Sequence, residues 1–305
     1  MIVTLTTDFG LSDGYVAAMK GAMLRVAPAV QLVDVSHAVE PQDVMEAAFV
    51  LAQAAPFMPD ETVHLVVVDP GVGTARRGVA ARVRRADGEA YTFVGPDNGI
   101  ASLLAADPAA GGEIVEAVVL DRPEAWGRAV PSATFHGRDI FGPVAARLAA
   151  GATLASVGTP AGALAPLHWP LPITDTQGIG GMVLHVDRYG NCLTNISREA
   201  VEHHGGGRPV TLYVGSAVVR GTTATFASVA PGEPAAIYGS GGHLEIVVNG
   251  GDAACLLSVR RGAAVTLVFG SPAAATARPC LPRRRQAPPA AGSPLPAAPH
   301  PLTLA

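Results

Sequence analysis

The sequence is poor in lysine, cysteine and charged residues, and each shortage narrows what the protein can do. Lys20 is the only lysine among 305 residues. Chemistry that needs lysine, such as a Schiff base or a phosphate-binding P-loop, therefore has one candidate, and Lys20 lies in neither kind of motif. The three cysteines (Cys192, Cys255 and Cys280) are odd in number and share no Cys-x-x-Cys spacing. The sequence thus indicates neither a disulfide framework nor a zinc site.

Charge and hydrophobic length set further bounds. Charged residues make up 15% of the chain and the formal net charge is −4, which argues against a nucleic-acid surface. No apolar run is long enough to cross a bilayer. The first ten residues, MIVTLTTDFG, lack a basic region followed by an apolar core, so they predict a first strand and not a signal peptide. We expect a soluble, cytoplasmic protein with no membrane partner.

The stretch VHLVVVDPGVGTARRG (63–78) organises the prediction. Its β-branched run 63–68 is typical of a strand buried on both faces of a parallel sheet. Asp69 follows where the strand ends, Gly71 and Gly73 permit a tight turn, and Arg76 comes seven residues after the acid. Ligands of open α/β sheets bind at this edge, so Asp69 and Arg76 form a candidate site. The alternative is a strand-end aspartate paired with a surface arginine.

Residues 1–160 alternate between strand and helix patterns. Strands are expected at 1–6, 31–35, 63–68, 79–85, 91–94 and 114–120, and helices at 15–26, 43–55, 100–106 and 142–149. This alternation predicts a Rossmann-like, layered α/β domain with a mostly parallel sheet.

The pattern changes after a proline-punctuated linker at 161–173. Short strands are expected at 182–186, 210–214, 235–238, 244–248 and 264–269, separated by Gly, Pro and Asn turns, with hardly any helix. Residues 174–270 therefore predict a small antiparallel β-barrel domain. Residues 271–305 are rich in Pro and Ala and are expected to be a disordered tail.

Polar loop segments supply the remaining candidates. They are TTDFG (6–10), GPDNG (95–99), TFHGRDIF (134–141), VDRYGNCLTNI (186–196) and GSGGHLEIVVN (239–249). Each has a structural alternative: Asp8 or Thr7 as a helix cap, GPDNG chiefly as a turn, and Asn191 as a turn former. His136 is the more telling residue, because Asp139 follows it closely and could fix the tautomer of its ring.

Common catalytic motifs are missing from these segments. There is no Gly-x-Ser-x-Gly nucleophile elbow and no His-Glu-x-x-His metal site, and GVG at 71–73 is too short for a dinucleotide fingerprint. The Asp-Phe-Gly triplet at 8–10 lacks the other kinase motifs. A metal site built from Asp8, Asp69 and His136 is conceivable, but no ligand spacing supports it.

The segments together, in this order, resemble the S-adenosyl-L-methionine (SAM) hydroxide adenosyltransferases, relatives of the fluorinase and chlorinase enzymes. The resemblance covers residues 1 to about 270 and implies hydrolysis of SAM to adenosine and L-methionine without a cofactor. It implies a Rossmann-like domain joined to a β-barrel, in a homotrimer whose active sites lie between subunits. The catalytic set of the family falls on Asp69, Arg76 and His136.

The resemblance also implies the substrate contacts. The ribose-binding acid falls on Asp8 and the adenine-binding asparagine on Asn191. The other residues expected around the adenine or methionine end of SAM are Asp187, Tyr189, Ser240, Glu245 and Val248.

The implied chemistry suits these residue types. A sulfonium leaves as a neutral thioether and needs no general acid, so the demand falls on activating water. Arg76 can stabilise a developing hydroxide, while Asp69 and His136 orient the water or accept its proton. Two alternatives stay open: a SAM-dependent halide (chloride) adenosyltransferase and a SAM-binding module without turnover. The retained Arg76 and His136 favour the hydrolase, because the halide enzymes depart from both.

Overall fold

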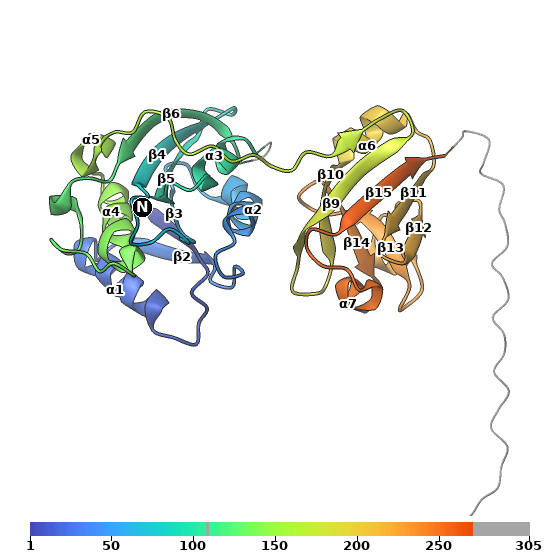
Figure 1. Ribbon diagram of the computed structural model, residues 1–305, viewed down its shortest axis with the longest axis horizontal. Coiled ribbons are helices and arrows are strands. Elements are labelled where there is room, and N and C mark those ends of the chain that lie inside the picture. Colours follow the sequence, from blue (N-terminus) through green and yellow to red (C-terminus); the bar gives the residue numbers. More distant parts are fainter. Residues whose placement is uncertain (108–109, 271–305) are drawn as a thin grey trace, which may run out of the picture.

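The computed structural model describes residues 1–107 and 110–270, and it contains two β-sheets joined by residues 161–172 (Figure 1). The first sheet ends before this segment and the second begins after it. The domain boundaries expected at 160 and 174 stay a prediction, and the expected tail at 271–305 lies outside the described residues.

The first sheet has seven strands in the order β2-β1-β3-β5-β4-β6-β7. The strands are β1 (Ile2–Thr7), β2 (Gln31–Ser36), β3 (Val63–Val67), β4 (Gly78–Arg85), β5 (Ala90–Pro96), β6 (Gly112–Val119) and β7 (Thr159–Pro160). Strands β2, β1, β3 and β5 pair in parallel, but β4, β6 and β7 pair antiparallel. The prediction of a mostly parallel sheet is thus wrong for the half formed by β4, β6 and β7. Residues 86–89 are too few for a crossover, so β4 and β5 form a hairpin.

Helices cover both faces of this sheet. Helices α1 (Tyr15–Val26), α4 (Gly142–Ala149) and α5 (Leu154–Val157) pack on one face, and α2 (Val44–Ala54) and α3 (Ile100–Ala105) on the other. Strand β3 is buried on both sides: Leu65 and Val67 contribute to the first core and Val66 to the second. This confirms the expectation for the central strand. A π-helix, Gly137–Phe141, leads directly into α4, and short 3₁₀ turns lie at Ala55–Phe57, Pro123–Ala125 and Phe226–Ser228.

The second sheet is an antiparallel, nearly closed barrel. Its strands are β8 (Ile173–Thr174), β9 (Gly178–Val186), β10 (Cys192–Ser197), β11 (Val210–Val214), β12 (Ala217–Arg220), β13 (Pro234–Tyr238), β14 (His243–Val248) and β15 (Ala264–Phe269). They follow the order β12-β11-β15-β9-β10-β14-β13, β8 pairs with β9, and β12 contacts β13 to bring the sheet round. The predicted barrel is confirmed, although β8, β10 and β12 were not expected.

Two helices interrupt the barrel, against the expectation of hardly any helix. Helix α6 (Arg198–Gly205) begins where Ser197 caps the amide of Ala200, and α7 (Ala253–Leu257) where Asp252 caps the amide of Cys255. The caps explain why short segments of weak periodicity still form helices.

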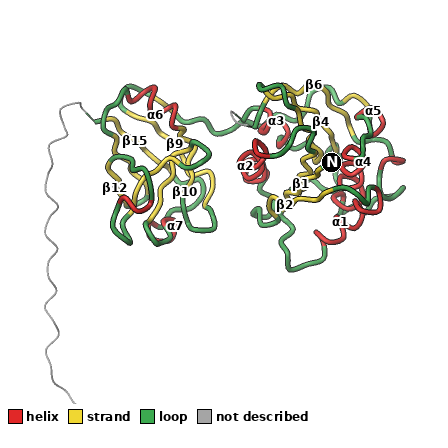
Figure 2. Tube along the Cα trace, turned by 180° about the vertical axis from the view of Figure 1, so that it is seen from behind, coloured by secondary structure: helices red, strands yellow, loops and turns green. Residues whose placement is uncertain are grey.

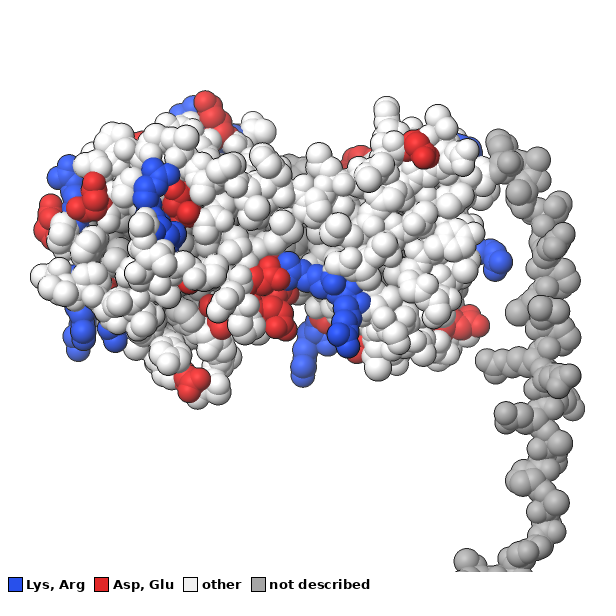
Figure 3. Space-filling model, viewed as in Figure 1, with Lys and Arg blue, Asp and Glu red and all other residues white. Residues whose placement is uncertain are grey.

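Helix α2 faces the barrel, as the view from behind shows (Figure 2). His185 Nδ1 on β9 lies 2.9 Å from Glu46 Oε1, and Arg261 pairs with Asp43 at the start of α2. The Phe49 ring lies 5.5 Å from the His185 ring. Basic and acidic side chains adjoin below this junction in Figure 3, whereas much of the face shown there carries no charge.

Candidate active site

The N-terminal candidate residues gather at the carboxyl ends of two parallel strands. Thr7 at the end of β1 stands beside Val67 at the end of β3. Asp8 and Asp69 therefore leave the same edge of the sheet. Asp8 is tied in place by the backbone, because its Oδ2 accepts a 2.8 Å hydrogen bond from the amide of Gln42. The edge is where an open α/β sheet presents ligand-binding groups.

The turn after β3 folds Arg76 back over Asp69. Arg76 Nη2 lies 2.5 Å from Asp69 Oδ2 and 2.9 Å from His136 Nδ1. Both side chains of the ion pair are largely buried, at 10% exposed for Arg76 and 6% for Asp69. The turn needs glycine at position 73, where φ is +76° and a Cβ would stand 2.5 Å from the carbonyl oxygen of Ala133.

The contact with Arg76 defines the protonation of His136. A guanidinium can only donate, so Nδ1 of His136 accepts, and the neutral ring carries its proton on Nε2. Burial and the nearby Arg76 charge both lower the pKa of His136, which keeps the ring neutral. His136 consequently offers an N–H donor, and not a free basic nitrogen, to whatever occupies the site.

Asp69 differs from His136 because one of its carboxylate oxygens has no hydrogen-bond partner among the described residues. Burial raises the pKa of the Asp69 carboxyl, and the Arg76 guanidinium opposes that rise. Its Oδ1 atom is buried and has no hydrogen-bond partner among the described residues. A carboxylate with raised pKa and one free oxygen is able to accept a proton.

Asp139 does not contact His136, so its expected role in fixing the tautomer is wrong. Its carboxylate accepts from the Arg138 side chain at 2.6 and 2.8 Å and from the amide of Ser132 at 2.8 Å. Burial alone would raise the pKa of Asp139, but the Arg138 hydrogen bond and the Ser132 amide hold it below its usual value. Asp139 therefore anchors the loop that precedes the π-helix, and Arg76 orients His136.

GPDNG does more than form a turn. Arg77 pairs with Asp97 and also donates to the carbonyl oxygens of Ala161 and Ala163 at 2.8 Å. Asp97 Oδ1 accepts from the amide of Ala165 at 2.8 Å. Arg77 and Asp97 thus hold the start of the segment between the two sheets. These contacts were not predicted, because the sequence of Ala161–Ala165 contains no recognisable motif.

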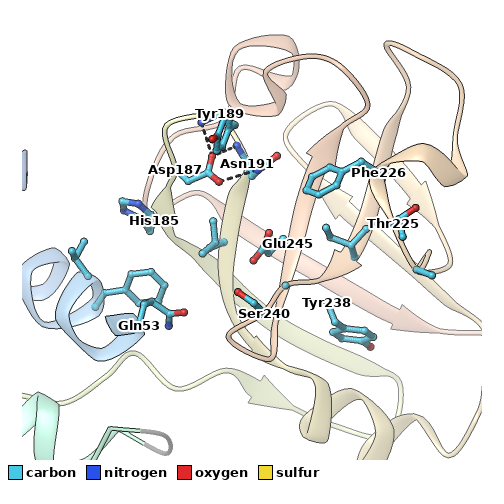
Figure 4. A pocket seen from close by; sticks show the side chains of 16 residues that line it. Gln53, His185, Asp187, Tyr189, Asn191, Thr225, Phe226, Tyr238, Ser240 and Glu245 are labelled. Atoms are coloured by element: carbon cyan, nitrogen blue, oxygen red, sulfur yellow. Dashed lines mark hydrogen bonds between the residues drawn. The ribbon is translucent and has the colours of Figure 1, made fainter. Parts of the chain in front are cut away.

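The C-terminal candidates line a cavity of about 650 Å³ on the barrel. Figure 4 shows them around one hollow, together with side chains from α2. Five of the expected substrate contacts belong to this cavity: Asp187, Tyr189, Asn191, Ser240 and Glu245. Val248 lines a neighbouring cavity of about 620 Å³ that shares Tyr189 and Asn191.

Asp187 organises the loop on which three of these residues stand. Its Oδ1 accepts from the amides of Tyr189 and Asn191, and its Oδ2 from the Asn191 side chain, each at 2.9 Å. Asn191 is buried, whereas the Tyr189 ring is 77% exposed. Burial and the nearby Asp187 charge raise the pKa of Glu245, which faces the same cavity.

Helix α2 supplies residues that the sequence did not indicate. Phe49 and Gln53 form one wall of the barrel cavity, beside His185 (Figure 4). They belong to the other sheet, and only the packing of α2 on the barrel brings them here. None of Asp69, Arg76 and His136 lines either barrel cavity. The described part of one chain therefore holds its candidate residues in two groups, the N-terminal set and the barrel set.

Comparison with known proteins accounts for this architecture. The family model described as the SAM hydroxide adenosyltransferase N-terminal domain matches residues 3–158, and that of the C-terminal domain matches residues 181–266. Two-domain proteins of this kind pair a layered α/β sheet with a barrel. The chain belongs to the SAM hydroxide adenosyltransferase family.

Individual relatives agree with this. An (R)-S-adenosyl-L-methionine hydrolase of Salinispora tropica is 44% identical over 271 residues, covering 88% of this chain and 98% of the relative. A fluorinase of Actinoplanes sp. is 29% identical, covering 87% and 97%. The crystal structure of an uncharacterized conserved protein from Thermotoga maritima matches with a TM-score of 0.78 at 36% identity, over 88% of this chain and all of that one.

The described residues contain neither a membrane-spanning helix nor a group of metal ligands. No helix there is long and apolar enough to cross a membrane. No three His, Cys, Asp or Glu side chains in residues 1–107 and 110–270 are grouped so that they could hold a metal ion.

Proposed function

We propose that this protein hydrolyses S-adenosyl-L-methionine to adenosine and L-methionine by attack of water at C5′ of the ribose. The carrying observation is the buried contact of one Arg76 nitrogen with both Asp69 and His136. The family and the hydrolase relatives support the same reaction.

The bond changes follow from the charges of the substrate. The water oxygen forms a bond to C5′ while the C5′–S bond breaks, and its electron pair stays on sulfur as a neutral thioether. The water must lose a proton, and its pKa is about 15.7 in bulk. Arg76 stabilises the developing hydroxide, His136 donates from Nε2 to orient it, and Asp69 accepts the proton at Oδ1. Asp69 is the better acceptor because both nitrogens of His136 are already committed.

Substrate binding is assigned to the flanking residues. Asp8 holds the ribose hydroxyls, and Asn191, ordered by Asp187, reads the adenine. Ser240 and Glu245 stand farther along the barrel cavity for the remaining polar groups of the substrate, with Tyr189 and Val248 as apolar contacts. No cofactor is assigned, and we expect the reaction to survive EDTA.

The separation of the half-sites supports an assembly. Because none of Asp69, Arg76 and His136 lines a barrel cavity of its own chain, we assign the complete site to two subunits of a homotrimer, the N-terminal set of one facing the barrel of the next. On assembly, the barrel of the next subunit covers the N-terminal set.

One incubation tests the reaction. Purified protein with SAM in chloride buffer, with and without EDTA, should yield adenosine and methionine in equal amounts by chromatography. A main product of 5′-chloro-5′-deoxyadenosine would instead establish the halide transferase that the fluorinase relatives suggest. Tight SAM binding without any product would establish a binding module.

A further inference from the structure

A chain of polar contacts runs from the surface of α1 to the loop that carries Asp8. Lys20 Nζ donates to Asp34 Oδ2 at 2.7 Å. Asp34 Oδ1 lies 3.1 Å from Nε2 of His37, which is within ion-pair distance but lacks hydrogen-bond geometry. His37 Nδ1 lies 2.8 Å from the hydroxyl of Thr7. Both Asp34 oxygens are thus used, one by an ammonium and one by an imidazole.

The inner end of this chain is buried and tied to the loop backbone. Thr7 is fully buried and His37 is 5% exposed. The Thr7 hydroxyl accepts from the amide of Phe9 at 3.3 Å, and the carbonyl oxygen of His37 accepts from the amide of Gly10 at 2.7 Å. His37 therefore contacts the loop on both sides of Asp8. Its side chain contacts Thr7, before Asp8, and its backbone carbonyl accepts from Gly10, after Asp8.

The donors and acceptors along the chain are mutually consistent. The Asp34 carboxylate faces Nε2 of His37 and favours the tautomer that carries the ring proton on that nitrogen. Nδ1 is then free to accept the Thr7 hydroxyl proton, which leaves a lone pair of that hydroxyl for the Phe9 amide. The inner contacts are hydrogen bonds of the buried Thr7 hydroxyl, whereas the contact between His37 and Asp34 is electrostatic.

We infer that Lys20, Asp34 and His37 are positioning residues that set the aim of Asp8 in the active site. This rests on the proposed function, in which Asp8 holds the ribose. Without the Lys20 charge, the half-exposed Asp34 is free to turn to water, His37 loses its outer contact, and the Thr7–Gly10 loop loosens. The single lysine of the chain therefore acts on substrate binding from outside the pocket.

The test compares Lys20→Met with Lys20→Arg and with Arg82→Met. Arg82 makes an ion pair with Glu61 of similar exposure on the same sheet, away from Asp8, and serves as the matched control. We expect Lys20→Met to raise KM for SAM about fivefold with kcat within twofold, since one hydrogen bond is at stake. Lys20→Arg should restore KM, and Arg82→Met should leave it unchanged.

The sole lysine permits a second test without mutation. Acetic anhydride transfers an acetyl group to Nζ, releases acetate and removes the charge, whereas reductive methylation keeps the charge. Acetylation should raise KM in the native sequence and leave Lys20→Arg unaffected, since the arginine is not modified. A KM that responds equally in both proteins would overturn the role of Lys20.

Amide hydrogen exchange keeps this test separate from the reaction itself. In Lys20→Met the segment 7–10 should exchange faster than in the native protein, and in Arg82→Met it should not. Unchanged exchange of this segment would overturn the inference even if SAM is hydrolysed. Absence of SAM turnover by the native protein would refute the proposed function while the exchange result still decides whether the contacts position the loop.

Discussion

Arg76 has five N–H donors, and three contacts of the folded chain engage only two of its nitrogens. Nη2 serves Asp69 and His136, and Nη1 donates to the carbonyl oxygen of Arg77 at 3.0 Å. Nε is buried and has no hydrogen-bond partner among the described residues. A buried N–H group without an acceptor raises the free energy of the folded protein, and a ligand oxygen that accepts from Nε would remove this penalty.

Replacing Arg76 should therefore damage the chemical step more than binding. Arg76→Ala should lower kcat by about 10²–10³, the effect of removing one preorganised donor to a developing anion. Arg76→Lys keeps the charge but not the planar fork and should recover only part of the rate. Asn191→Ala should mainly raise KM, because the adenine contact proposed for Asn191 is the same in ground and transition state. The measurement is kcat and KM for the three variants, with SAM affinity by calorimetry.

A near-normal kcat in Arg76→Ala would show that no hydroxide is stabilised there. Loss of SAM binding as complete as in Asn191→Ala would make Arg76 a binding residue.

The protonation of Asp69 and His136 predicts the shape of the pH profile. Asp69 must be ionised to accept the proton, and burial raises its pKa, so kcat should fall as the pH drops through that raised value. The pKa of His136 is lowered by burial and by the Arg76 charge, which extends the pH range of the neutral ring toward acid. The variant His136→Asn should be slower but keep the acid limb of the native enzyme, as measured by kcat against pH. If the limb vanishes with His136, the histidine is the base.

At the scale of elements, patterns within one segment were predictable and patterns between segments were not. The run 63–68 had the composition of a strand buried on both faces, and β3 is one. The antiparallel pairing of β4 with β5 follows from the short loop 86–89, whereas the pairing of β4 with β6 depends on the partner it finds in space. The π-helix at Gly137–Phe141 resembles the start of an ordinary helix in sequence, because the two differ only in hydrogen-bond register.

The candidate site divides in the same way. Asp69, Arg76 and His136 could be found because they stand next to strand ends, turns and a helix start that the sequence marks. Their mutual contacts are those expected of the catalytic set, whose role stays a prediction. Asp139 follows His136 closely in the sequence, but its carboxylate accepts a hydrogen bond from Arg138 instead. Gln53 lines the barrel cavity only because α2 packs against the barrel.

The turn between Asp69 and Arg76 provides an element-scale prediction. Gly73→Ala should lower kcat and melting temperature together, because the new Cβ would collide with the Ala133 carbonyl and push apart the loops that carry Arg76 and His136. Gly88→Ala is the matched control: its φ is +92° but nothing lies within 4 Å of the added atom. It should cost about 1 kcal/mol of backbone strain and leave kcat alone. Equal effects of the two substitutions would show that backbone conformation, and not the Ala133 contact, matters at position 73.

At the scale of the whole molecule, α2 already occupies one side of the barrel cavity of its own chain. The Glu46–His185 and Asp43–Arg261 contacts hold that arrangement, and none of Asp69, Arg76 and His136 lines the cavity. Bringing Arg76 to Asn191 within one chain would need a different packing of the two sheets. A second subunit can supply the missing half without that rearrangement, which is the physical argument for a shared site.

Mixing two inactive variants tests the shared site directly. Arg76→Ala spoils the N-terminal half-site and Asn191→Ala the barrel half-site, so each variant alone should have low activity at limiting SAM. If subunits are unfolded together, mixed one to one and refolded into rings, about a quarter of the sites should combine an intact N-terminal half with an intact barrel half. Activity should then rise to about a quarter of the native level. The double variant Arg76→Ala/Asn191→Ala, refolded with the native protein, is the control for exchange and should also leave about a quarter of the sites intact. If exchange is proved by mass spectrometry and the complementing mixture stays inactive, each site is built within one chain and the proposed assembly is wrong.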